Sequence, residues 1–149
     1  MKILCSTILI FVFSSGPAPL TEQSNLILGK WISSQGNVIV HVIKDSTFFK
    51  GKIIWFNDTD DESRPMLLRK DIKNPDVNLR SRNILGLDVI VGLTYNPACN
   101  CWQNGVIYDT NSGREWSASI RMENENRLRI RGFWKFEFIG RTMIFKRLK

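Results

Sequence analysis

Histidine is almost missing from this sequence, and its scarcity restricts the chemistry that the protein can perform. His41 is the only histidine in 149 residues, and only three cysteines accompany it. A structural zinc site takes about four such ligands, and a Ser–His–Asp triad needs a histidine beside a serine. The sequence also has no glycine-rich phosphate loop. We therefore expect no catalytic residues, no metal and no cofactor, with an enzyme that uses Asp71, Asp76 or His41 as a minor alternative.

Long apolar runs are also scarce, because the only one lies at the N-terminus. Lys2 precedes an apolar stretch over residues 3–13, and small residues follow it. This pattern is typical of a secretory signal peptide, and the stretch is too short to span a bilayer comfortably. We predict a signal peptide over residues 1–20, cleaved between Ser15 and Gln23. The mature protein then has no transmembrane span. A single-pass anchor is the alternative.

Two cysteines remain once this segment is removed. Cys99 and Cys101 are separated by one residue. In an oxidising compartment, such a pair can close a small ring, and strained disulfides are the ones that exchange easily. The pair is therefore a candidate disulfide, with two free loop cysteines as the alternative, and the sequence leaves the choice open.

An alternation of apolar and polar residues with a period of two dominates from residue 29 onward, as expected for half-buried strands. The runs are short, and turn-forming residues separate them. One long insertion, over residues 69–87, lacks clear alternation. We predict a single all-β domain over residues 25–149, an antiparallel sandwich or barrel. The expected strands begin at Gly29 and then cover residues 37–43, 47–56, 88–93, 105–108, 115–122, 127–133 and 141–147.

The same alternation assigns side chains to the interior. His41 is expected on the opposite face, toward solvent, because it alternates with Val40 and Val42. The predicted inward residues are Trp31, Phe49, Ile53, Trp55, Trp116, Ile120, Leu128 and Ile130. Aromatic walls with a few polar groups form many small-ligand sites, and a packed core made of the same residues is the alternative.

Several motifs follow one another in a characteristic order. They are G-K-W at Gly29, G-K-I-I-W at Gly51, D-I-K-N-P-D at Asp71, W-Q-N-G-V-I-Y-D at Trp102, R-G-F at Arg131 and G-R-T at Gly140. This order resembles the bacterial family known as domain of unknown function 2147, over residues 29–147. The chain departs from the family pattern at Asn104, where the family has glycine, and at Thr110, where it has proline.

The resemblance implies a small periplasmic or secreted protein with a lipocalin-like barrel of about eight strands. In such barrels, the tryptophan of the G-x-W motif closes one end, and an arginine of the last strand packs over its indole. Gly29, Trp31 and Arg147 match these positions. The family has no settled activity, so the expected role, to carry or sense a small apolar or amphipathic ligand in the bacterial envelope, rests on fold analogy.

Eight residues are the candidates for contact with that ligand. Tyr108 and Arg131 are the polar ones that the family pattern retains. Asp71, Asn74 and Arg80 lie in the long insertion, which we expect to form a lid across the barrel mouth. The aromatic candidates are Trp55, Phe49 and Trp116.

The charge of the chain suggests a second type of partner. The formal net charge is +7, and Arg127, Arg129 and Arg131 alternate with apolar residues, so that their side chains share one face. Arg121 of the preceding strand joins this predicted basic face. Because an exported protein rarely meets nucleic acid, an anionic envelope lipid or polysaccharide is the expected partner. A solvated strand face is the alternative.

Overall fold

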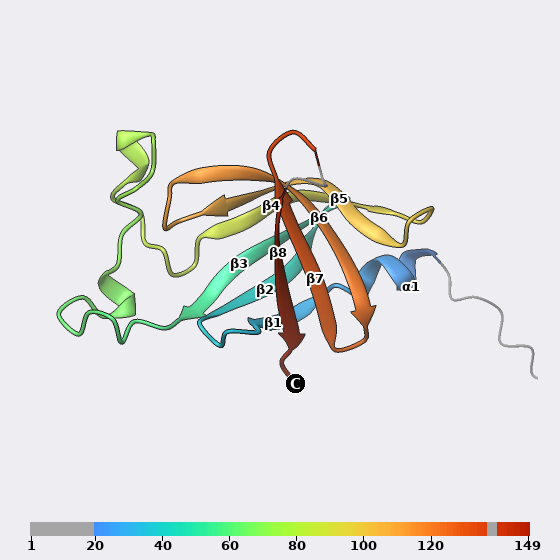
Figure 1. Ribbon diagram of the computed structural model, residues 1–149, viewed down its shortest axis with the longest axis horizontal. Coiled ribbons are helices and arrows are strands. Elements are labelled where there is room, and N and C mark those ends of the chain that lie inside the picture. The colour runs from blue at the N-terminus through green and yellow to red at the C-terminus, as the bar shows by residue number, and fades with distance from the viewer. Residues whose placement is uncertain (1–19, 137–139) are drawn as a thin grey trace, which may run out of the picture.

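The computed structural model describes residues 20–136 and 140–149. Eight antiparallel strands form a closed barrel, in which each strand pairs with the next and β8 pairs with β1 (Figure 1). The strands are β1 (Gly29–Ser33), β2 (Val38–Asp45), β3 (Phe48–Phe56), β4 (Asp88–Asn96), β5 (Cys101–Asp109), β6 (Arg114–Asn124), β7 (Arg127–Phe133) and β8 (Gly140–Arg147). The predicted all-β barrel is therefore confirmed, and closure gives each of the eight described strands a partner on both sides. The predicted signal peptide lies almost entirely outside the described residues.

Strand β5 is longer than predicted. It begins at Cys101 rather than at Gly105 and contains a β-bulge, since its register with β6 shifts between Trp102 and Gly105. Asn104, inside the bulge, has a φ of 65°. An extra residue interrupts the alternation, so a reading based on a period of two finds only the part of the strand that follows the bulge.

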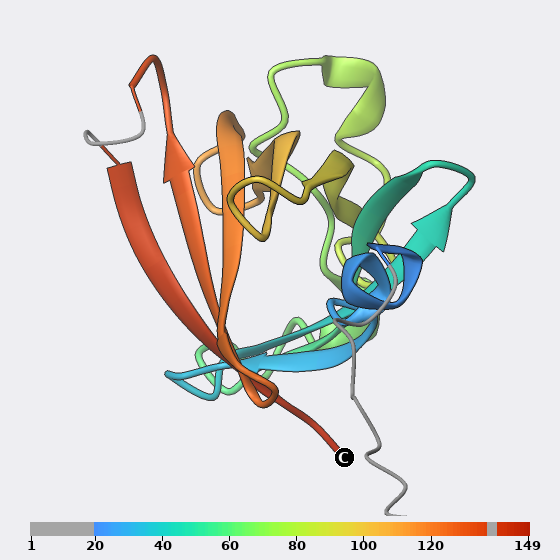
Figure 2. The ribbon, with the colours of Figure 1, turned by 90° about the vertical axis from the view of Figure 1, so that its right-hand side faces the viewer.

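One end of the barrel is closed by a short N-terminal helix, α1 (Leu20–Asn25), and by the residues that follow it. Trp31 is 1% exposed, and its indole N–H donates to the carbonyl of Ile27 at 2.8 Å. The indole of Trp102 donates to the carbonyl of Ser24 in α1 at 3.0 Å. Figure 2 looks onto this end, with α1 in front of the strands.

Gly29 and Arg147 meet at the same end. The Arg147 guanidinium carbon lies 4.1 Å from the centre of a Trp31 ring, which is the arrangement that the family resemblance implies. A Cβ atom on Gly29 would lie 3.0 Å from an Arg147 nitrogen, and the φ of Gly29 is 121°. Both the backbone conformation and the lack of a side chain at residue 29 are therefore needed for this closure.

The long insertion between β3 and β4 lies at the opposite end of the barrel from α1 (Figure 1). It covers residues 57–87 and contains two single-turn 3₁₀ helices, η1 (Met66–Leu68) and η2 (Val77–Leu79). The turn between β5 and β6 lies at the same end. This end is therefore built from loops rather than from a closing helix.

Candidate functional site

The interior of the barrel is packed at the α1 end and open at the insertion end. The pairing of β7 with β8 is regular and sets Leu128 opposite Phe145 and Ile130 opposite Met143. These four side chains share the inner face, because cross-strand partners point to the same side. Phe145 is 5% exposed, whereas Met143, one step further from α1, is 40% exposed. Solvent therefore reaches the inner face at the insertion end.

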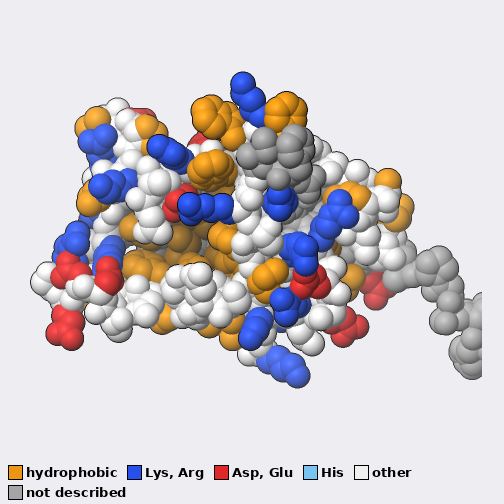
Figure 3. Space-filling view, viewed as in Figure 1, with side chains coloured by type: hydrophobic (Ala, Val, Ile, Leu, Met, Phe, Trp, Pro, Cys, Tyr) orange, Lys and Arg blue, Asp and Glu red, His pale blue; other side chains and the backbone are white. Residues whose placement is uncertain are grey.

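Other strands show the same gradient. On β6, Ile120 and Ala118 are buried, whereas Trp116 is half-buried at the insertion end and Met122 is half-buried at the α1 end. On β2, Val40 is buried and Val38 is half-buried. Figure 3 shows a hollow with hydrophobic side chains in its floor, between the insertion and β8. We call this hollow the cup; its half-exposed apolar residues on the inner face are Val38, Phe56, Trp116 and Met143.

Glycines show where the interior has room. A Cβ atom on Gly51 would lie 2.8 Å from a methyl carbon of Val40 and 3.1 Å from one of Ile90, so the barrel is filled there. A Cβ atom on Gly132 would come no closer than 3.5 Å to any atom, the nearest being the Cβ of Trp116. A methyl group on Gly132 would therefore fit in ordinary van der Waals contact beside Trp116, at the open end.

Trp55 does not face this interior, and its predicted inward orientation is wrong. The register of β2 with β3 shifts, because Val40 pairs with Ile53 whereas Ile39 pairs with Trp55. Ile54 is the extra residue of a β-bulge, and one extra residue moves every following side chain to the other face. Trp55 thus shares the outer face with Ile39, and Phe56 takes the inward position.

Two further ligand candidates lie away from the cup. Phe49 is buried in the packed part of the barrel. Arg131 lies between the inward residues Ile130 and Gly132 and therefore points outward, where it donates to the Thr142 hydroxyl at 3.0 Å. Of the aromatic candidates, Trp116 alone lies in the cup. The predicted inward positions of Trp31, Ile53, Ile120, Leu128 and Ile130 agree with their burial.

The cup contains residues that the sequence reading missed. Phe56 reaches it through the bulge, which no local signal reveals. Met143 and Arg141 belong to the inner row of β8, because Arg141 pairs with the inward residue Gly132. Counting back in steps of two from the apolar Phe145 would have found both of them.

A buried polar network lies between the insertion and the barrel. Asp71 is 0% exposed, and its carboxylate accepts from the Tyr108 hydroxyl at 2.6 Å and from the Asn74 amide at 2.9 Å. Arg82 forms an ion pair with the same carboxylate at 2.8 Å, and its guanidinium lies over the Tyr108 ring. A buried carboxylate needs such partners, because an unpaired buried charge is costly. The D-I-K-N-P-D motif thus anchors the insertion to β5.

This network leaves little for a ligand to bind. The Asn74 amide is also 3.0 Å from the Tyr108 hydroxyl, and Arg80 donates to the Asn74 carbonyl at 2.7 Å. Burial, and secondly the hydrogen bond to Asp71, raises the pKa of Tyr108, so its hydroxyl stays protonated and continues to donate. The structure brings together Asp71, Asn74, Arg80 and Tyr108 as predicted, but they bind to one another at the side of the open end.

The predicted basic face is partly neutralised. Glu123 forms ion pairs with both Arg127 and Arg129, and the hydrogen bond from Arg129 is the main cause of the lowered pKa of Glu123. Arg121 lies beside Arg129 in the register of β6 and β7. Lys and Arg side chains gather over β7 and β8 with acidic side chains among them (Figure 3). This face is therefore a mixed-charge surface rather than a continuous cationic stripe.

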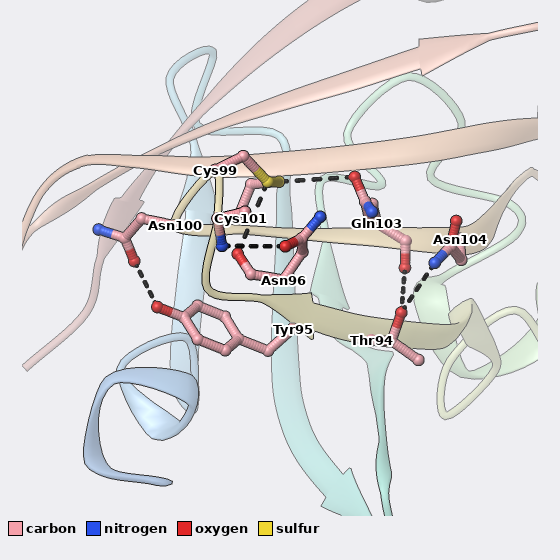
Figure 4. The surroundings of a disulfide bond; sticks show 9 residues. Thr94, Tyr95, Asn96, Cys99, Asn100, Cys101, Gln103 and Asn104 are labelled. Atoms are coloured by element: carbon pink, nitrogen blue, oxygen red, sulfur yellow. Dashed lines mark hydrogen bonds between the residues drawn. A yellow bond between two sulfur atoms is a disulfide. The ribbon is translucent and has the colours of Figure 1, made fainter. Parts of the chain in front are cut away.

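Cys99 and Cys101 form a disulfide, in the turn between β4 and β5 (Figure 4). Asn100 between them has a φ of 47°, and its side-chain oxygen accepts from the Tyr95 hydroxyl at 2.8 Å. The Tyr95 ring packs against Trp102 at the closed end of the barrel. The disulfide therefore lies far from the cup.

Two other hollows lie outside the barrel interior. One of about 250 Å³ adjoins the β2–β3 turn and includes Phe49, and one of about 300 Å³ surrounds the β5 bulge. Residues 20–136 and 140–149 contain no group of three His, Cys, Asp or Glu side chains arranged to hold a metal ion. No helix in that part of the chain is long and apolar enough to cross a membrane.

Comparison with known proteins agrees with this geometry. The model of a family described as uncharacterized proteins conserved in bacteria, DUF2147, matches residues 29–147. Among curated proteins, none matches the chain. A solved structure, that of protein HP1028 from the human pathogen Helicobacter pylori, is described as belonging to the lipocalin family. It is 19% identical to this chain, with a TM-score of 0.69 over 83% of each chain, a likeness of fold.

Proposed function

Because the chain belongs to the DUF2147 family and folds as a lipocalin-like barrel, we propose that it is a non-enzymatic protein that binds a small apolar or amphipathic molecule in the cup. One observation carries this proposal: four apolar side chains on the inner face are half-exposed at the insertion end, and Met143 among them reaches 40% exposure. Burying such side chains against an apolar ligand is favourable by about 25 cal/mol per Å² of apolar surface removed from water.

The surroundings of the cup support binding rather than catalysis. The carboxylate of Asp71 is surrounded by Tyr108, Asn74 and Arg82, so it is held by other side chains rather than poised to attack a substrate. His41 pairs with Lys52 on β3 and alternates with the inward residues Val40 and Val42, so it lies on the outer face. Neither residue faces a ligand in the cup.

Probe binding tests the proposal. The neutral fluorophore N-phenyl-1-naphthylamine should bind the purified protein saturably. Gly132→Leu should weaken binding at least about tenfold, because the new side chain extends from the inner face into the cup beside Trp116. Gly132 has no positive φ and lies in a regular strand, so the variant should fold. Trp55→Leu, on the outer face, is the matched control and should bind as the unaltered protein does.

Either of two results would overturn the proposal. The first is that the unaltered protein shows no saturable binding of the probe. The second is that Gly132→Leu, with an unchanged circular dichroism spectrum, binds as strongly as the unaltered protein. Native mass spectrometry of protein purified from the envelope of a bacterial host then measures the mass of any carried molecule.

Export to the periplasm or out of the cell is part of the proposal. It is supported by the apolar N-terminal segment and by the Cys99–Cys101 disulfide, because such bonds persist in oxidising compartments. Protein exported by a bacterial host should react with a thiol-alkylating reagent at Cys99 and Cys101 only after reduction. Protein expressed in the cytosol without residues 1–19 should react directly. Free thiols at Cys99 and Cys101 in the exported protein would contradict the proposal that the disulfide persists in an oxidising compartment.

A further inference from the structure

Two arginines belong to the inner rows of the barrel at its open end. Arg114 follows the parity of Trp116 on β6 and lies opposite Asp109 of β5, and Arg141 lies on β8. Arg141 pairs with Gly132, and Gly132 pairs in turn with Ala118. Ala118 is buried on the inner face of β6, so this row of cross-strand partners, Arg141 included, points to the inside. Arg141 is nevertheless exposed. Its place is therefore the lip of the cup, where the inner face meets solvent.

Gly140 positions this arginine. A Cβ atom on Gly140 would lie within 3 Å of both the carbonyl oxygen of Gly132 and the Cβ of Phe133, so only glycine allows β8 to begin this close to β7. The close approach sets Arg141 directly opposite Gly132, which has no side chain to occupy the space in front of it. The next inward residue along β8 is Met143, so a cationic position and an apolar one follow each other into the cup.

Arg141 differs from the arginines of the outer face. Arg127 and Arg129 are both paired with Glu123. Arg141 has no carboxylate within 4 Å among the residues that the structure describes, and its exposed position lets a ligand approach it. A guanidinium presents several N–H donors in a planar fork that matches an oxyanion.

We propose that the cup selects single-chain amphiphiles with an oxyanion head group, which Arg141 binds at the lip while the chain lies against Met143, Trp116 and Phe56. This inference rests on the proposed function and adds the class of ligand. The arrangement suits such a molecule because its charge stays at the solvent boundary, where desolvation costs little, and only its apolar part is buried. A ligand without charge would use the apolar residues but not Arg141.

Displacement of N-phenyl-1-naphthylamine by two amphiphiles of equal chain length tests the inference, below their micelle concentrations. Dodecanoate should displace the probe at about tenfold lower concentration than 1-dodecanol, the ratio expected for one charge-assisted contact of about 1.4 kcal/mol. In Arg141→Gln, dodecanoate and 1-dodecanol should displace the probe at equal concentrations. In Arg141→Lys, dodecanoate should still displace it at a somewhat lower concentration than 1-dodecanol. Arg121→Gln, which removes the same charge from the outer face of β6, should leave the preference intact.

The outcomes separate this inference from the proposed function. Binding of both amphiphiles without preference by the unaltered protein, or an undiminished preference in Arg141→Gln, overturns the role of Arg141 and leaves the ligand-binding cup in place. Absence of binding of the probe overturns both. Sodium dodecyl sulfate in place of dodecanoate shows whether a sulfate head group serves as well as a carboxylate. A preference that survives high salt unchanged also contradicts the assignment, because a contact at the lip is screened.

Discussion

The Arg147 guanidinium lies 4.1 Å from the centre of a ring of Trp31 and holds three carbonyl groups around it. It donates to Leu28 and Glu125, each at 2.8 Å, and to Leu26. One side chain of the last strand thus joins the first strand, the segment before it and the β6–β7 turn. Burial lowers the pKa of Arg147, but a guanidinium stays charged at any ordinary pH.

Replacing Arg147 should therefore destabilise the barrel. We expect Arg147→Ala to lower the free energy of unfolding by about 2–3 kcal/mol, since a cation–π contact and several hydrogen bonds are lost together. Arg147→Lys should retain only part of the free energy of unfolding that Arg147→Ala loses, because an ammonium group above the ring cannot reach all three carbonyls. Urea denaturation followed by tryptophan fluorescence measures both variants. Equal stability of Arg147→Ala and the unaltered protein would contradict this role.

The two glycines on the inner face should respond in opposite ways to the same substitution. Gly51→Ala places a Cβ atom 2.8 Å from Val40 and should cost about 1–3 kcal/mol through overpacking. Gly132→Ala places a Cβ atom 3.5 Å from its nearest neighbour, the Cβ of Trp116. This substitution should be neutral or slightly stabilising, because it reduces the conformational entropy of the unfolded chain. Denaturant midpoints compare the pair. An equal loss of stability in both variants would show that the interior is packed as tightly around Gly132 as around Gly51.

The buried hydroxyl of Tyr108 should contribute to stability more than that of Tyr95. Tyr108→Phe removes a hydrogen bond to the buried carboxylate of Asp71, and we expect a loss of about 1.5–3 kcal/mol. Tyr95→Phe removes a hydrogen bond to the exposed residue Asn100 and should cost about 0.5–1 kcal/mol. Thermal and urea unfolding measure the difference. The reverse order would contradict the anchoring role of the network.

The raised pKa of Tyr108 also predicts how stability depends on pH. In the folded protein the phenol loses its proton at a higher pH than the ordinary value of 10.0, so the folded state holds the proton more tightly than the unfolded state. This stabilisation is complete below pH 10 and is lost as the pH rises through the pKa of the folded state. In Tyr95→Phe, Tyr108 is the only tyrosine, and its absorbance titration should have a midpoint above 10. A midpoint below 10 would contradict the burial of this group.

Much of the fold was predictable from local patterns, because a strand with one buried face alternates with a period of two. That rule located most of β2, β3, β6, β7 and β8 and the inward positions of Trp116 and Ile120. The rule fails at bulges, because one extra residue changes the parity without any change in composition. The rule therefore assigns Trp55 to the wrong face and misses the first part of β5.

The candidate site was less predictable, because its residues come from separate strands and their exposure depends on what covers them. Asp71 and Tyr108 are 37 residues apart, and both fit the sequence pattern of ligand contacts. Only their mutual contact and burial show that they anchor the insertion. Arg131 and Arg141 are equally basic in sequence, and the register of β7 with β8 alone sends one outward and the other to the lip.

The sequence by itself determined the all-β class, the family motifs and the closely spaced cysteines, since each depends on residues close together in the chain. The tertiary structure decided which end of the barrel is closed, where the cup lies and which arginines lie at its lip. The physical reason is that barrel closure joins β1 to β8, more than 100 residues apart, and packs α1 into one end only. Exposure of an inner face arises from that asymmetry, which no local segment contains.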